Sequence, residues 1–253
     1  MHAKPTDVAA RCLSAVVLRL VPHGPIGSIP SFRYTADMAP ILPSICERAI
    51  LEQFLKAEAM ALWAVRSAQV QDVPPGVLQF LRRHEEEEAQ HLKQFELLLG
   101  TKSHGKTSLP RVPDQWRVLA VHLYGYETLG LEFARLLVGL RPDLTSIMED
   151  EEVHVGFFEQ EVRAILSRGG LAADGARQAA QAWRRRLPRT VDRYLHDESL
   201  APFRDELRQH ILGVIDARFL ESGLFVWSEK QKSSVLDPAG EESDAYSIFE
   251  SNG

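Results

Sequence analysis

The chain has 253 residues, of which 45% are hydrophobic, and a formal net charge of −6 at pH 7. This length allows one sizeable domain with extensions, or at most two domains. The negative charge gives the molecule as a whole no bulk attraction for nucleic acid or for an anionic membrane. The two cysteines, Cys12 and Cys46, exclude a disulfide framework and a cysteine-ligated iron–sulfur cluster or rubredoxin module, and they suit a reducing cytoplasm. No apolar stretch approaches the length of a transmembrane helix, and no glycine-rich nucleotide fingerprint follows a strand pattern.

Residues 1–40 contain five prolines, and we expect them to form an arm that lies mostly outside the core. The apolar run from Leu13 to Val21 is interrupted by Arg19, which makes it a poor signal peptide. Two interpretations of residues 1–37 stay open. They could be a transit peptide, or translation could start at Met38, just before the first good helix pattern.

Residues 41–168 have the periodicity and punctuation of four helices, and no segment of the chain has a convincing strand pattern. In the first helix, Ser44 and Glu47 have the spacing of a capping box. The expected helices run from Ser44 to Gln69, from Pro74–Pro75 to Gly100, from Asp114 to near Gly139, and from Pro142–Asp143 to Gly169–Gly170. The sequence therefore predicts an all-α fold.

The second and fourth of these helices share the pattern Glu-x-x-His-x-x-x-Phe-Glu. It begins at Glu88 with His91, and again at Glu151 with His154. A Glu and a His three residues apart lie about 60° apart around a helix, so both side chains reach the same place. Two such pairs on neighbouring helices can converge on a pair of metal ions. Taken alone, a Glu-x-x-His pair is usually fortuitous, and the acidic run from His84 to Glu88 would more often be a solvated face.

The first and third helices supply one glutamate each at matching positions. Glu58 aligns with Glu127 when the two helix pairs are superposed, and the small residues Ala61 and Gly130 align one turn later. A bulky side chain at Ala61 or Gly130 would occupy the space of a metal pair. An internal repeat that carries the same groups in the same order is harder to obtain by chance than a single motif. Glu132 is the alternative to Glu127, because its distance to the Arg141–Pro142 turn mirrors that of Glu151.

These residues resemble the ligand set of the ferritin-like di-iron carboxylate superfamily, which includes ferritins, rubrerythrins, manganese catalases and di-iron oxygenases. The resemblance covers roughly residues 41–168 and implies an antiparallel four-helix bundle that holds two iron ions, with manganese as an alternative. It implies the metal ligands Glu58, Glu88, His91, Glu127, Glu151 and His154. Glu88 and Glu151 would bridge the ions, and each histidine would bind one of them.

Three activities are compatible with that resemblance. The first is an O₂-activating oxygenase or oxidase that acts on a small organic substrate and takes electrons from an external donor. The others are a ferroxidase or iron-binding role and the removal of peroxide. A metal-free helical interaction module is the non-enzymatic alternative. We rank the oxygenase first, because storage subunits carry little beyond the bundle and a complete rubrerythrin carries a cysteine-ligated electron carrier.

Residues 169–228 are expected to add two or three helices that pack on the bundle, and residues 229–253 to form a disordered acidic tail. The first added helix carries the basic cluster Arg184, Arg185, Arg186, Arg189 and Arg193. A solvated face is the simpler interpretation of this cluster. Contact with nucleic acid, a carrier protein or a phosphorylated substrate is the alternative.

Overall fold

The computed structural model describes residues 40–102 and 112–225, and within these ranges every regular element is a helix. The prediction of an all-helical protein is confirmed for this part of the chain. None of its helices has an apolar run long enough to cross a membrane. The predicted N-terminal arm and acidic tail lie outside the described residues.

Six α-helices follow one another in residues 40–102 and 112–225, joined in places by short 3-10 helices. The α-helices are α1 (Glu47–Ala68), α2 (Pro75–Leu99), α3 (Trp116–Leu140), α4 (Thr145–Ser167), α5 (Gly170–Tyr194) and α6 (Arg204–Glu221). The 3-10 helices cover Ser44–Cys46, Pro142–Leu144 and Glu198–Phe203. The helices thus follow the order predicted from the sequence, and residues beyond 169 add α5 and α6.

Proline and glycine define the limits of α2 as expected. Pro75 is its first residue, where the missing N–H costs no helical hydrogen bond. Gly100 follows the last residue with φ 64°, a left-handed conformation that is easy for glycine, and its N–H turns back toward the carbonyls of Glu96 and Leu97. The sequence therefore predicts both ends of α2.

The capping box predicted at Ser44 and Glu47 is wrong. Ser44 lies in a 3-10 turn, α1 begins at Glu47, and no side chain caps this helix. Glu47 instead accepts a hydrogen bond from Arg141 at 3.0 Å, so a contact distant in sequence takes the place of the capping box. Asp114 does not cap α3 either. The residue directly before this helix is Gln115, and no side chain caps the helix.

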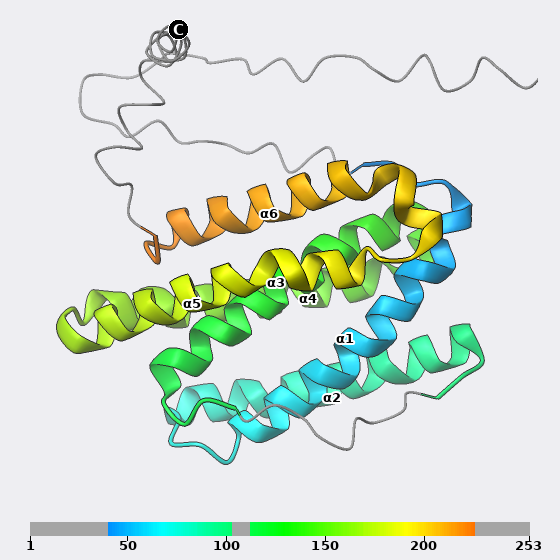
Figure 1. The fold of residues 1–253 in the computed structure, drawn as a ribbon. Helices are drawn as coiled ribbons and strands as arrows, with labels where there is room; N and C mark the ends of the chain where they lie inside the picture. The colour runs from blue at the N-terminus through cyan, green and yellow to red at the C-terminus, as the bar shows by residue number, and fades with distance from the viewer. Residues whose placement is uncertain (1–39, 103–111, 226–253) are drawn as a thin grey trace, which may run out of the picture. The chain divides into compact units, whose positions relative to one another are not determined.

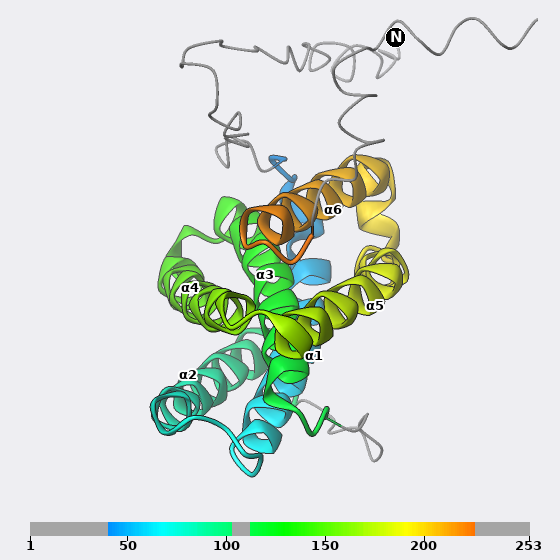
Figure 2. The same ribbon diagram turned by 90° about the vertical axis from the view of Figure 1, so that its left-hand side faces the viewer.

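The α3 helix lies at the centre of the described fold. It packs against α1, α4, α5 and α6, and Figure 2 shows α4 and α5 on its two sides. The α1 and α2 helices form a second tightly packed pair, seen below α3 and α5 in Figure 1. Because α3 is surrounded, apolar residues are buried along most of its length.

The added helices pack on α3, and each buries an apolar stripe. In α5 the buried stripe includes Ala176, Ala180 and Trp183, and in α6 it includes Leu207 and Ile211. The tightest contact is between the Trp183 ring and the backbone of α3. A Cβ atom added at Gly125 would lie 2.6 Å from that ring, so the close approach of α5 to α3 requires glycine there.

A Gly125→Ala variant tests this contact. We expect a loss of about 1–3 kcal/mol in the free energy of unfolding, because the new methyl group displaces a buried ring. Gly139→Ala in the same helix is the control: nothing lies within 4 Å of its added Cβ atom. That change should be neutral or stabilise by up to about 1 kcal/mol through helix propensity. Equal unfolding free energies of the two variants, measured with urea, would contradict the packing described.

Candidate metal centre

The fold brings the six predicted ligand residues together inside the protein. Their side chains come from α1, α2, α3 and α4, one glutamate from each helix and one histidine from each of α2 and α4. Every one of them is at most 4% exposed: Glu58, Glu88, His91, Glu127, Glu151 and His154. Buried carboxylates are costly unless they are paired, protonated or bound to a cation, so this concentration of acid requires an explanation.

The ligand atoms fall into two groups that share one glutamate. In each group the candidate donor atoms lie within 4.8 Å of one another, a separation that a single metal ion can bridge. The first group is His84, Glu88, Glu127 and His154, and the second is Glu58, Glu88, His91 and Glu151. Glu88 belongs to both groups and so occupies the position of a bridging carboxylate. Glu151 belongs to the second group alone, although its carboxyl also interacts with that of Glu127.

His84 joins the first donor group although it was not among the predicted ligands. The side chain is completely buried, its Nε2 atom lies 2.9 Å from Oε1 of Glu88, and its ring centroid is 3.8 Å from that of His154. The signal was present in the spacing, because His84 lies four residues before Glu88 and therefore on the same helix face. Within the run from His84 to Glu88, the two buried residues, His84 and Glu88, are the ones that join the donor groups.

Two further carboxylates, also missed, hold the histidines in a reciprocal arrangement. Each Glu-x-x-His motif is preceded by an acid, Glu87 on α2 and Asp150 on α4. Nε2 of His154 lies 3.0 Å from Glu87, and Nε2 of His91 lies 3.1 Å from Asp150. When Nε2–H donates to the carboxylate, the lone pair is left on Nδ1. Such outer carboxylates orient a histidine and increase its basicity toward a metal.

Unpaired polar atoms concentrate in this cluster. Among the described residues, seven buried side-chain nitrogen or oxygen atoms have no hydrogen-bond partner, and six of them belong to the two groups. They are both carboxylate oxygens of Glu58, Oε2 of Glu88, and Nδ1 of His84, His91 and His154. Leaving a buried polar atom without a partner costs about 1–3 kcal/mol, so six in one place indicate that a partner is needed. The donor set, three imidazoles and four carboxylates, fits a metal ion that prefers nitrogen and oxygen.

Without a cation, the carboxylates must share protons. Burial, reinforced by the charge of Glu88, raises the pKa of Glu58 and of Glu151 well above the usual value. Burial also raises the pKa of Glu127 to about 7, although the neighbouring His84 opposes this change. A proton on Glu58 allows a hydrogen bond to Glu88. The metal-free cluster therefore holds protons that a metal ion would displace.

Among the remaining groups, Glu88 is biased toward the ionised form, and His154 and His84 are biased in opposite directions. Burial opposes ionisation of Glu88, but the hydrogen bond that Glu58 can donate once it is protonated, together with the contact to His84, outweighs burial and lowers the pKa of Glu88 to about 2. Burial and the adjacent His84 lower the pKa of His154 to about 4. In contrast, the charge of Glu127 outweighs the burial of His84 and raises its pKa. Glu88 and His154 are thus in the protonation states that metal binding requires.

Glu132, the alternative to Glu127, is engaged elsewhere. It is 2% exposed, and its Oε1 atom accepts a hydrogen bond from Arg135 at 2.7 Å, with His210 at 3.4 Å from Oε2. Glu127 joins the first donor group and Glu132 joins neither. The glutamate favoured by the alignment of the two helix pairs thus lies in the cluster, and its role as a metal ligand stays a prediction.

Other residues near the motifs have ordinary structural roles. The small residue at Gly130 faces the cluster, where an added Cβ atom would lie 3.1 Å from Oε2 of Glu151. Tyr124 is a core residue whose hydroxyl donates to the Arg218 carbonyl. Glu159 is half-buried and accepts hydrogen bonds from Arg163. None of these side chains adds a donor to the two groups.

Comparison of the chain with protein-family models, curated proteins and solved structures gives no significant match. The conclusions about the site therefore depend on its geometry and chemistry.

Substitution of the two competing glutamates separates their roles. Glu127→Gln should abolish metal binding by the first group, because an amide is a weaker ligand than a carboxylate, while raising the stability of the metal-free protein. Glu132→Gln should leave metal binding intact and lower the free energy of unfolding by about 3 kcal/mol, because it breaks a buried ion pair. Metal content and urea unfolding measure both effects. Loss of metal in the Glu132 variant alone would reverse the assignment.

The stability of the metal-free protein should fall as the pH rises from about 6.5 to 8.5. Glu58, Glu127, Glu151 and His84 all have raised pKa values in the folded state. The folded state therefore holds more protons than the unfolded state and loses this advantage as the pH passes the folded pKa values. Glu127 alone should contribute a loss on the order of 1 kcal/mol over this range. Metal-loaded protein should not show the decline. A flat or rising profile of the metal-free protein would contradict the proton sharing.

Proposed function

We propose that α1–α4 form a ferritin-like four-helix bundle and that the buried cluster holds two metal ions. One ion would bind His84, Glu88, Glu127 and His154, and the other Glu58, Glu88, His91 and Glu151. The observation that supports this most strongly is the set of six unpaired buried atoms, all of which face one cluster. Two cations would neutralise the glutamates and give those atoms partners.

The donor set favours iron, with manganese as the alternative. Carboxylate oxygens and imidazole nitrogens suit both metals, whereas a metal that prefers thiolates finds no cysteine in either group. The described cysteine, Cys46, is a buried free thiol at the start of α1, which agrees with the proposed cytoplasmic location.

We propose that the protein is an oxidoreductase that activates O₂ to oxidise a small organic molecule. Two ferrous ions in such a site would supply two electrons to O₂. The protein supplies the environment: α1–α4 exclude water from the cluster, and Glu87 and Asp150 hold the hydrogens on Nε2 of the two histidines. An external electron donor is required for repeated turnover, because the sequence offers no cysteine-ligated cluster and no nucleotide fingerprint.

The added helices support a substrate enzyme over a storage role. The α5 and α6 helices pack on α3, and α5 also packs on α4, so they cover two of the four helices that supply ligands. A storage cage would have to form its contacts between subunits around these added helices. The following experiment distinguishes iron storage and peroxide removal from the oxidation of a small organic molecule.

The experiment loads metal-free protein with Fe(II) under anaerobic conditions and then adds O₂. We expect close to two iron ions per chain, a single round of O₂ consumption, and further rounds once a reductant is supplied. His91→Ala and His154→Ala should lose metal and O₂ consumption while circular dichroism shows their helical content unchanged.

Three results would contradict this proposal. Protein that binds neither iron nor manganese would disprove the metal centre. Continued uptake of thousands of iron ions per assembly would indicate storage. Rapid O₂ evolution from peroxide by manganese-loaded protein would indicate a catalase-like activity.

A further inference from the structure

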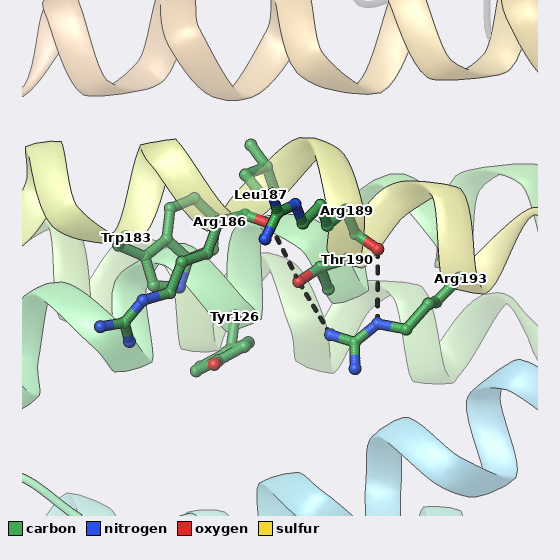
Figure 3. Close-up of a pocket in the computed structure, with 7 residues that line it drawn as sticks. All are labelled: Tyr126, Trp183, Arg186, Leu187, Arg189, Thr190 and Arg193. Carbon is green, nitrogen blue, oxygen red and sulfur yellow. Dashed lines mark hydrogen bonds between the residues drawn. The ribbon is translucent and has the colours of Figure 1, made fainter.

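A second site lies on the surface between α3 and α5, where arginines surround an aromatic floor. The pocket has a volume of about 480 Å³, within the range of sites that bind small molecules. Its apolar part consists of Tyr126, Trp183 and Leu187, and its charged part consists of Arg186, Arg189 and Arg193. Figure 3 shows Tyr126 beneath α5, with the arginines spread along that helix.

The geometry divides the basic cluster of α5 into two functional parts. Arg184 on α5 forms a bidentate ion pair with Asp216 on α6. Asp192 on α5 forms an ion pair with Arg208 on α6 at 2.7 Å. These contacts tie α5 to α6 and account for that side of the helix structurally. The pocket arginines lie at the spacing i, i+3 and i+7, which places them together on a different face.

The pocket arginines have no acidic partner among the described residues. Arg193 donates to the Arg189 carbonyl and to the Thr190 hydroxyl, which positions its guanidinium without neutralising it. Arg186 adds its charge to burial in lowering the pKa of the half-buried His122, so its positive field reaches into the protein. Three uncompensated guanidinium groups around one pocket are suited to an anion, because each can donate two parallel hydrogen bonds to a phosphate or carboxylate.

The floor of the pocket is suited to a flat apolar group. Tyr126 is 52% exposed, and its ring meets that of Trp183 edge to face, with ring centroids 5.9 Å apart. The Trp183 side chain has no space to move further inward, because it is buried against Gly125 of α3. An exposed aromatic surface on a rigid support favours stacking of an aromatic ligand.

We propose that this pocket binds a small organic anion in which a phosphate or carboxylate group is attached to an aromatic or similar apolar body. The arginines hold the anionic group, and Tyr126, supported from behind by Trp183, contacts the apolar part. Binding at this site does not require metal, so it can be measured independently of the cluster.

The test uses 1-naphthyl phosphate as the probe and metal-free full-length protein, with binding followed by calorimetry. We expect one saturable site per chain and affinity that weakens as salt rises. Arg186→Gln combined with Arg189→Gln should raise the Kd at least about tenfold, as expected for the loss of charge-assisted hydrogen bonds. Arg185→Gln is the matched control, since Arg185 is an exposed arginine of the same helix that does not line the pocket.

Further probes separate the two halves of the ligand. 1-Naphthoate should bind and 1-naphthol should not, and Tyr126→Ala should remove the preference for 1-naphthyl phosphate over inorganic phosphate. The proposal is overturned if the probe does not saturate a site, if 1-naphthol binds as well as the phosphate, or if Arg185→Gln weakens binding as much as the double variant does.

Discussion

The described fold depends on one constraint, the burial of four glutamates around a common point. In the interior a lone carboxylate charge is strongly destabilising, and four close together repel one another as well. The metal-free protein reduces this cost by retaining protons on Glu58, Glu127 and Glu151. Two divalent cations would remove it altogether. The apolar packing of α3 against α4, α5 and α6 supplies the stability that lets the helices tolerate such a cluster.

Two carboxylate–histidine contacts in the cluster are reciprocal. The acid before each Glu-x-x-His motif binds the histidine of the opposite motif, Glu87 with His154 and Asp150 with His91. The two contacts cross between α2 and α4, so each helix fixes the ring orientation on the other. His84 breaks this symmetry, because α4 offers no matching histidine four residues before Glu151. The first donor group therefore has two imidazoles and the second has one, which would give two bound ions different environments.

Much of this centre follows from local spacing in the sequence, and the remainder needed the tertiary structure. The helix period places Glu88 with His91 on one face, and the internal repeat pairs Glu58 with Glu127. The same period places His84 on the face of Glu88, but whether that face turns inward so near the start of the run depends on tertiary packing, and so His84 was not among the predicted ligands. The capping box at Ser44 failed for a similar reason, because the ion pair of its glutamate with a distant arginine is invisible in local sequence.

Anomalous X-ray diffraction at the iron edge, from crystals of iron-loaded protein, tests the central claim most directly. The account predicts two peaks about 3–4 Å apart, with Glu88 between them and His91 and His154 on different ions. The peak beside His154 should also lie within bonding distance of His84. An absence of anomalous density in the cluster, or a single peak that none of the three histidines contacts, would contradict it.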